Sequence, residues 1–180
     1  FLIADAMNDT IWGGGNWSRG TGWNGTAWRA QTLKRRDLSG KTGTTNSAVD
    51  TWFTGFNSNL VATSWVGFDA PSRALGRTAY NTNLDEKQTS GGESGAKTAL
   101  PAWIDFMAEV LPDIPVQYRE IPEGIVSVRV DIKTGLLSRK TDHTTRFEFF
   151  KQGTEPTEYV DANQTIDNQK DMIEEDEGLF

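Results

Sequence analysis

The chain has 180 residues, of which 36% are hydrophobic and 11% aromatic, and these values fit one ordinary globular domain with a buried core. It contains no cysteine, which excludes disulfides and cysteine-ligated zinc sites. Residues 161–180 carry −6 of the formal net charge of −7 and have the composition of a disordered acidic tail, so we expect no nucleic-acid partner.

No apolar run is long enough to cross a membrane, and the first residues lack the basic and apolar regions of a signal peptide. Phe1 opens the chain within a helical pattern, without a capping residue before it. We therefore expect a segment of a longer protein, whose membrane anchor would lie upstream.

The first predicted elements are a helix and a tryptophan-rich loop. Ile3, Met7 and Ile11 recur at a helical spacing until the glycines at residues 13–15 break the pattern, which predicts a helix over residues 1–12. The loop over residues 13–29 follows. We expect it to be ordered by buried indoles, those of Trp12, Trp17, Trp23 and Trp28.

Three segments that favour β-structure come next, over residues 38–45, 51–56 and 61–68, and a turn at residues 57–59 joins the last two. They predict an antiparallel meander, in which we expect three aromatic side chains to pack on the next strand: Trp52, Phe53 and Phe56. Residues 71–99 are polar and glycine-rich and predict a long surface connection.

A second helix is predicted over residues 101–111, because apolar residues fall on one of its faces: Trp103, Met107, Val110 and Leu111. We expect it to pack on the sheet with Trp103 in the core. Residues 125–132 then alternate strictly, with Val126, Val128, Val130 and Ile132 on one face. Lys133-Thr134-Gly135 predicts a turn, and residues 146–150 a further strand.

These elements predict an α+β fold, with an antiparallel sheet packed by helices. We divide the chain into a main domain over residues 1–111, a small β-rich appendage over residues 112–160 and the acidic tail. Lys34, Arg35 and Arg36 form the only basic cluster, which we interpret as a solvated approach to a strand. His143 is the only histidine, and we expect it on the surface rather than at a metal or catalytic site.

The residues with the clearest chemistry are Lys41, Thr42, Gly43, Thr44 and Thr45. Gly40-Lys41-Thr42 invites a phosphate-loop interpretation, but that loop needs a glycine where this chain has Arg35, and a helix after it. The alternative is an edge strand beside a cleft. A cation, two hydroxyls and free backbone N–H groups can grip an extended peptide that ends in a carboxylate, and Gly43 lets its backbone approach closely. A threonine-rich edge strand with a solvated lysine also fits this pattern.

Further motifs recur in the same order in one family. They span residues 20–23, 35–46, 50–56, 65–69, 95–97 with 101–103, and 122–126. On these motifs, and on Lys-Thr-Gly as a penicillin-binding signature, residues 1–160 resemble the C-terminal part of the transpeptidase domain of class A bifunctional penicillin-binding proteins. The similarity is to the 1A type of Gram-negative bacteria, and it implies a serine β-lactamase/transpeptidase-like fold.

The resemblance also implies a D,D-transpeptidase, in which a serine attacks the D-Ala-D-Ala bond of a peptidoglycan stem peptide and β-lactams acylate the same serine. Lys41 would sustain the electropositive hydrogen-bonded network around the nucleophile. Thr42 and Thr44 hydroxyls would bind the substrate carboxylate, with Thr45 a weaker candidate, and the Thr44 N–H would be an oxyanion-hole donor. No cofactor or metal is implied.

The nucleophile motif that the family carries upstream of Lys41 is missing, so we expect this chain alone to be inactive. Ser94-Gly95-Ala96-Lys97 fits the Ser-x-x-Lys pattern, but it lies downstream in a glycine-rich loop, and we interpret Lys97 as part of the approach to the second helix. Two other interpretations stay open: a noncatalytic docking module of the cell-wall synthesis machinery, and a fragment of a β-lactamase-like hydrolase.

The resemblance implies partners and a location for the parent protein. The partners are stem peptides ending in D-Ala-D-Ala, β-lactams, the upstream half of the same domain and, as a further candidate, an outer-membrane lipoprotein activator. The parent would also carry a peptidoglycan glycosyltransferase and face the periplasm from the inner membrane. Because the chain without its upstream half would expose apolar surface, we expect it either to self-associate or, if it comes from a cleaved parent, to stay bound to the other half.

Overall fold

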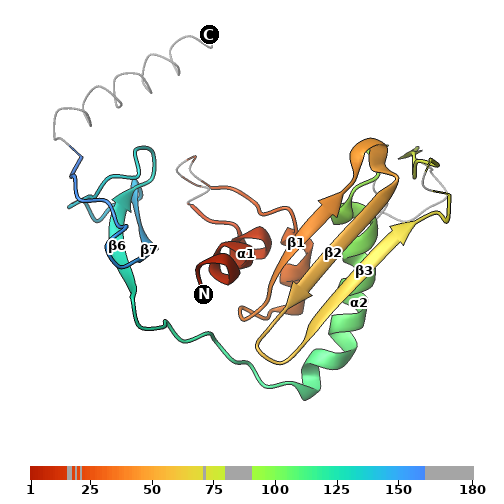
Figure 1. The fold of residues 1–180 in the computed structure, drawn as a ribbon, viewed down its shortest axis with the longest axis horizontal. Coiled ribbons are helices and arrows are strands. Elements are labelled where there is room, and N and C mark those ends of the chain that lie inside the picture. The colour runs from red at the N-terminus through yellow and green to blue at the C-terminus, as the bar shows by residue number, and fades with distance from the viewer. Residues whose placement is uncertain (16–17, 19, 21, 71, 80–90, 161–180) are drawn as a thin grey trace, which may run out of the picture. The chain divides into compact units, whose positions relative to one another are not determined.

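The computed structural model describes residues 1–160 except 16–17, 19, 21, 71 and 80–90; the predicted acidic tail over residues 161–180 therefore lies outside the described part. The chain forms two compact units, Phe1–Glu120 and Ile121–Phe180. The fold is α+β with antiparallel sheets, as predicted (Figure 1). The division into domains after residue 111 stays a prediction.

The main sheet of the first unit has three antiparallel strands in the order β1-β2-β3 (Figure 1). They are β1 (Ser39–Thr44), β2 (Asp50–Phe56) and β3 (Val61–Gly67), each within one residue of the predicted bounds. Asn57 makes the predicted turn, because its Oδ1 accepts hydrogen bonds from the N–H groups of Asn59 and Leu60 at 2.9 and 2.8 Å. The meander is confirmed.

Helix α2 (Leu100–Val110) covers one face of this sheet. Trp103 is buried, as predicted; its ring packs edge-on against Phe53 at 4.8 Å, and its Nε1 donates to Ala62 O at 3.1 Å. A Cβ on Gly55 would lie 2.3 Å from the Trp103 ring, so glycine is required for this close packing. Phe53 thus packs on α2, whereas Trp52 packs on Trp65 of β3 and stays 43% exposed.

Helix α1 (Leu2–Trp12) lies beside β1 and ends at Gly13, whose φ of 61° suits glycine (Figure 1). The remaining elements of this unit are short. They are the 3₁₀ helices η2 (Trp28–Leu33), η3 (Asn46–Ala48) and η5 (Leu111–Asp113), the π-helix η4 (Gly95–Ala99), and strands β4 (Arg77–Thr78) and β5 (Gly91–Gly92).

The prediction of buried indoles in the tryptophan-rich loop is wrong for two of them. Trp23 is 38% exposed and Trp28 is 46% exposed, while Trp12 is half-buried and Trp17 lies outside the described residues. Both exposed rings still make contacts. Arg29 lies over the Trp28 ring at 5.2 Å, and Gly14 lies against the Trp23 indole, because a Cβ on Gly14 would be 3.0 Å from Trp23 Nε1.

The second unit is built on an antiparallel hairpin of β6 (Ile125–Asp131) and β7 (Thr145–Lys151), within one residue of the predicted strands. The predicted turn is present, because Asp131 Oδ1 accepts from the N–H groups of Lys133 and Thr134 at 3.1 and 2.9 Å. Among the described residues of this unit, Val130 is the only hydrophobic residue that is buried, and Ile132 is 38% exposed. The unit thus has a small core.

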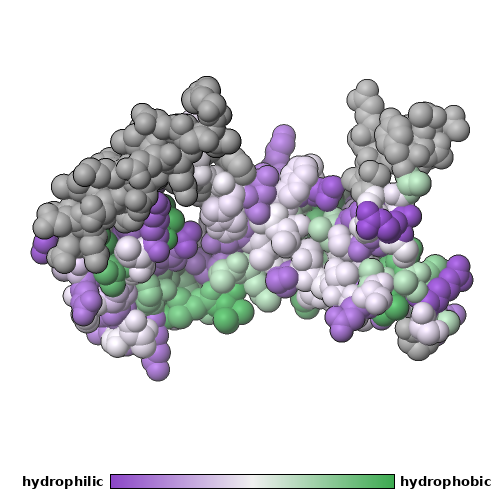
Figure 2. Space-filling model, turned by 90° about the horizontal axis from the view of Figure 1, so that it is seen from above, coloured by the Kyte–Doolittle hydropathy of each residue, from purple (hydrophilic) through white to green (hydrophobic). Residues whose placement is uncertain are grey.

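Hydrophobic residues reach the surface in several places, as the space-filling view shows (Figure 2). In the first unit, the sheet face opposite α2 exposes Trp52, Val61 and Trp65. Self-association through such surface stays a prediction. No helix among the described residues is long and apolar enough to span a membrane.

Candidate functional site

Lys41, Thr42, Gly43, Thr44 and Thr45 lie at the outer edge of the main sheet, because β1 is its outermost strand. Thr45 N donates to Asp50 O at 3.0 Å, which shows that odd-numbered residues of β1 pair with β2. Backbone groups alternate along a strand, so those of Thr42 and Thr44 point away from the sheet, along its free edge.

Helix α1 covers only the first half of this edge. Asn8 Nδ2 donates to Leu38 O, and Thr10 Oγ1 donates to Gly40 O, both at 2.6 Å. These carbonyls belong to even-numbered residues, which agrees with the alternation at the other end of the strand. Among the described contacts of α1 with backbone oxygens of this strand, Gly40 is the last, so α1 leaves the edge uncovered at Thr42 and Thr44.

The side chains of this segment leave the strand on two faces. Gly43 lies on the face of Trp52, since an added Cβ would be 3.2 Å from Trp52 Cβ, and Lys41 shares that face by alternation. Lys41 is exposed and bends to the edge, where its Nζ donates to Thr42 O at 2.8 Å. The ammonium and the threonine hydroxyls are therefore available at one edge, although their side chains start on opposite faces.

The three threonines differ in their hydrogen bonds. Thr42 Oγ1 donates to Thr26 Oγ1 at 3.1 Å, and Thr44 Oγ1 accepts from Gly95 N at 3.0 Å. Thr45 Oγ1 accepts from Asp50 N at 2.9 Å and is thus part of the turn between β1 and β2. The structure brings Lys41, Thr42 and Thr44 to the open edge and holds the Thr45 hydroxyl away from it.

The Ser94-to-Lys97 segment forms the start of the helical run that leads into α2, as predicted. Lys97 Nζ donates to Gly91 O at 2.9 Å and pairs with Glu93 at 3.1 Å, and both side chains of this ion pair are at most 10% exposed. Burial raises the pKa of the Glu93 carboxyl, but hydrogen bonds from Thr78 and Lys97 outweigh it and hold this pKa below its ordinary value. Lys97 thus has a structural role here.

The basic cluster before β1 is not solvated at Arg35, which corrects our interpretation. Arg35 forms a bidentate ion pair with Asp37, in which Nε and Nη2 donate to the two carboxylate oxygens at 2.9 and 2.8 Å. The Asp37 side chain is fully buried. Burial raises the pKa of the Asp37 carboxyl, but hydrogen bonds from Arg35 and Gln117 N outweigh it, so this pKa lies below its ordinary value. Arg36 instead lies over the Trp12 ring at 3.9 Å.

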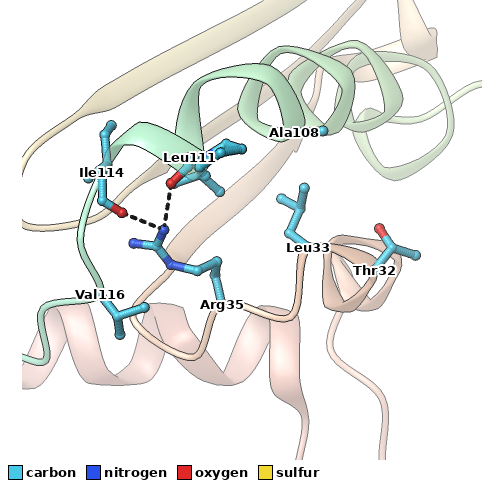
Figure 3. A pocket seen from close by; sticks show the side chains of 8 residues that line it. Thr32, Leu33, Arg35, Ala108, Leu111, Ile114 and Val116 are labelled. Carbon is cyan, nitrogen blue, oxygen red and sulfur yellow. Dashed lines mark hydrogen bonds between the residues drawn. The ribbon is translucent and has the colours of Figure 1, made fainter.

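Arg35 also anchors the segment that follows α2. Its Nη1 donates to Leu111 O and Ile114 O at 3.0 and 2.9 Å, as Figure 3 shows. The same arginine borders a mostly apolar pocket of about 490 Å³, lined by Thr32, Leu33, Arg35, Ala108, Leu111, Pro112, Ile114 and Val116. None of Lys41, Thr42, Gly43, Thr44 and Thr45 lines it, so this pocket is separate from the open edge of β1.

Sequence reasoning missed Thr26 and Gly95 as neighbours of the edge strand. Thr26 precedes Thr42 by 16 residues and Gly95 follows Thr44 by 51, and no spacing in the sequence relates these positions. His143 is half-buried. Within the described part of the chain, no group of three or more histidine, aspartate or glutamate side chains could hold a metal ion.

Comparisons with known proteins agree on one family. Residues 121–165 match the model of the penicillin-binding protein 1A C-terminal domain. The chain is 56% identical over 168 residues to penicillin-binding protein 1A of Vibrio cholerae, a match that spans 92% of this chain and 20% of that protein. The chain belongs to the penicillin-binding protein 1A family.

Two further members of the penicillin-binding protein 1A family support this assignment. The protein from Escherichia coli is 45% identical over 159 residues, which is 88% of this chain and 18% of that protein. The crystal structure of penicillin-binding protein 1A from Haemophilus influenzae matches with a TM-score of 0.73 and 44% identity, over 89% of this chain and 21% of that chain. The chain thus spans about a fifth of the length of these relatives.

Proposed function

We propose that this chain provides the substrate-binding strand of a peptidoglycan D,D-transpeptidase, and that its parent protein cross-links the cell wall. The observation that carries the proposal is the free edge of β1, where the Lys41 ammonium and the backbone of Thr42 and Thr44 lie beside the half-buried Thr42 and exposed Thr44 side chains. The relatives are named penicillin-binding proteins, and a strand edge of this kind suits a peptide or a β-lactam that carries a carboxylate.

Each residue of the edge takes a role that its position supports. The Thr42 and Thr44 hydroxyls bind the substrate carboxylate, and the Lys41 ammonium supplies positive charge beside it. The Thr44 N–H points from the free edge, where it can donate to the oxyanion of the acylation transition state; one such donor contributes about 3 kcal/mol. Gly43 keeps the Trp52 face of the strand free of a further side chain. Thr45 supports the turn.

The nucleophile belongs to another part of the parent protein, because this chain lacks the family's serine motif before Lys41. We assign the parent a serine acylation mechanism, a peptidoglycan glycosyltransferase and a site at the periplasmic face of the inner membrane. The upstream half of the transpeptidase domain is then an obligatory partner of this chain. An outer-membrane lipoprotein activator remains a candidate partner of the parent.

A chimera tests this function. The Vibrio cholerae relative would receive this chain in place of its own matching segment, and covalent labelling by a fluorescent penicillin would be measured. We expect the chimera to be labelled and Lys41→Ala to slow labelling by about tenfold to a hundredfold, the range for loss of a charge-assisted hydrogen bond. Lys140→Ala, which removes an exposed lysine of the second unit, should label at the unchanged rate.

The isolated 180-residue chain provides the complementary measurement. It should not be labelled, because it lacks the nucleophile. Labelling of the isolated chain at Ser94 would contradict the proposal, and so would a folded chimera that Lys41→Ala leaves fully active. A chimera that folds but binds no penicillin would instead favour a docking role.

A further inference from the structure

Gly95 lies directly against the site strand, at a position where no side chain fits. A Cβ on this residue would be 2.4 Å from Trp52 O, 2.5 Å from Gly43 O and 3.0 Å from Gly43 N. All three atoms are backbone, so they cannot move aside as a flexible side chain would. This close approach brings the Gly95 N–H within 3.0 Å of Thr44 Oγ1.

The direction of that hydrogen bond determines what Thr44 can offer a ligand. A hydroxyl has one proton and accepts with its lone pairs. Because Thr44 Oγ1 accepts from Gly95, its own proton remains available for an acceptor at the exposed edge. Thr42 differs, since its hydroxyl already donates to Thr26 and must turn before it can donate to a ligand.

The segment η4, which contains Gly95, is fixed by contacts of two of its side chains. On one side, Lys97 is paired with Glu93 and bound to Gly91 O, with little exposure of either charged side chain. On the other side, Thr98 Oγ1 lies 2.8 Å from Thr51 Oγ1, and Thr51 is the β2 residue opposite Thr44. The Gly95 N–H is therefore fixed relative to the strand that it contacts.

We propose that Gly95 is a positioning residue for Thr44: its N–H fixes the Thr44 hydroxyl as a ready donor to the carboxylate of the substrate or β-lactam. This inference rests on the proposed function of the edge strand. It predicts that Gly95 affects recognition of the carboxylate specifically, in addition to any effect on packing.

The test uses the chimera and two fluorescent penicillins that differ only in the ring carboxylate, one a free acid and one its methyl ester. The readout is the ratio of the acid and ester labelling rates. We expect Gly95→Ala and Thr44→Val each to lower this ratio by about tenfold, the lower range for loss of a hydrogen bond to a charged group, and Thr44→Ser to retain it. In the Thr44→Val background, Gly95→Ala should lower the ratio no further.

Gly92→Ala is the matched control, because it lies three residues before Gly95, in β5, and the atom nearest to its added Cβ is 4.0 Å away. It should leave the ratio unchanged. A Gly95→Ala variant that slows both penicillins equally would show a packing role only and would overturn the inference. Full-rate labelling of Lys41→Ala would instead contradict the proposed function itself. The failure of the inference about Gly95 and the failure of the proposed function therefore give different results.

A second measurement applies if Gly95→Ala does not fold. Amide hydrogen exchange of the full 180-residue chain would follow the Gly95 N–H. We expect this amide to exchange about tenfold faster in Thr44→Val than in the unsubstituted chain or in Thr44→Ser, because only valine lacks the acceptor. Equal exchange in all three proteins would overturn the inference.

Discussion

Replacement of Arg35 by methionine should destabilise the first unit strongly. Five hydrogen bonds of its guanidinium would be lost: two to Asp37 and one each to the carbonyls of Leu111, Ile114 and Pro115. The Asp37 side chain is fully buried and would retain only the Gln117 N–H at 3.3 Å among these partners. Removal of one partner of a buried ion pair costs about 3–5 kcal/mol, a large part of the stability of an ordinary domain.

Urea unfolding followed by tryptophan fluorescence measures this effect, because all seven tryptophans belong to the first unit. Arg73→Met is the matched control. Arg73 is exposed and lies over the Phe68 ring at 3.8 Å, a contact worth at most about 1 kcal/mol at the surface. The slope of the free energy against urea should stay constant, so that the difference reflects stability alone.

Equal destabilisation by the two substitutions would refute this reasoning. It would mean that the Arg35 ion pair, although buried, is as weak as a surface contact. Arg35→Lys adds a further check, because an ammonium cannot reproduce the forked geometry. We expect lysine to recover less than half of the lost free energy.

Three other substitutions test the first unit. The pKa of the Asp37 carboxyl is held below its ordinary value of 3.8, so the stability that this carboxylate contributes should be complete above pH 3.8 and should decline as the pH falls through the lowered pKa. In urea titrations at acid pH, the difference in free energy of unfolding between the unsubstituted chain and Asp37→Asn should therefore shrink as the pH falls. Gly55→Ala should cost about 1–3 kcal/mol by overpacking Trp103, whereas Gly92→Ala should leave the melting temperature unchanged. Asn57→Ala should cost about 1–2 kcal/mol in the same urea assay, since two N–H groups lose their acceptor, and an unchanged midpoint would contradict the assigned turn.

The regular elements could be predicted closely because their signals are local. Periodicity in residues 101–111 and alternation in residues 125–132 depend only on neighbours in the sequence, and both elements formed within one residue of the expected bounds. The turn at Asn57 was equally local. Long-range packing decided which side chains are buried, and local signals did not predict this. The apolar character of Trp23 and Trp28 suggested burial, although their rings reach solvent.

Arg35 shows that local sequence also fails to predict whether a charged side chain is solvated. A run of three basic residues predicts solvation, and only the approach of residues 111–117 to the start of β1 gives Arg35 its buried partners. The chain segments that meet there are about eighty residues apart in sequence. No local pattern encodes such a meeting.

The sequence by itself determined which chemical groups the site contains and the family to which they belong, because Lys41, Thr42, Gly43 and Thr44 form a contiguous motif within longer motifs in a fixed order. Only the tertiary structure decided which of these groups face outward. Strand pairing with β2 leaves the backbone of Thr42 and Thr44 at the free edge, and α1 closes that edge as far as Gly40. The approach of Gly95 then orients the Thr44 hydroxyl, since hydrogen-bond direction depends on neighbours in space.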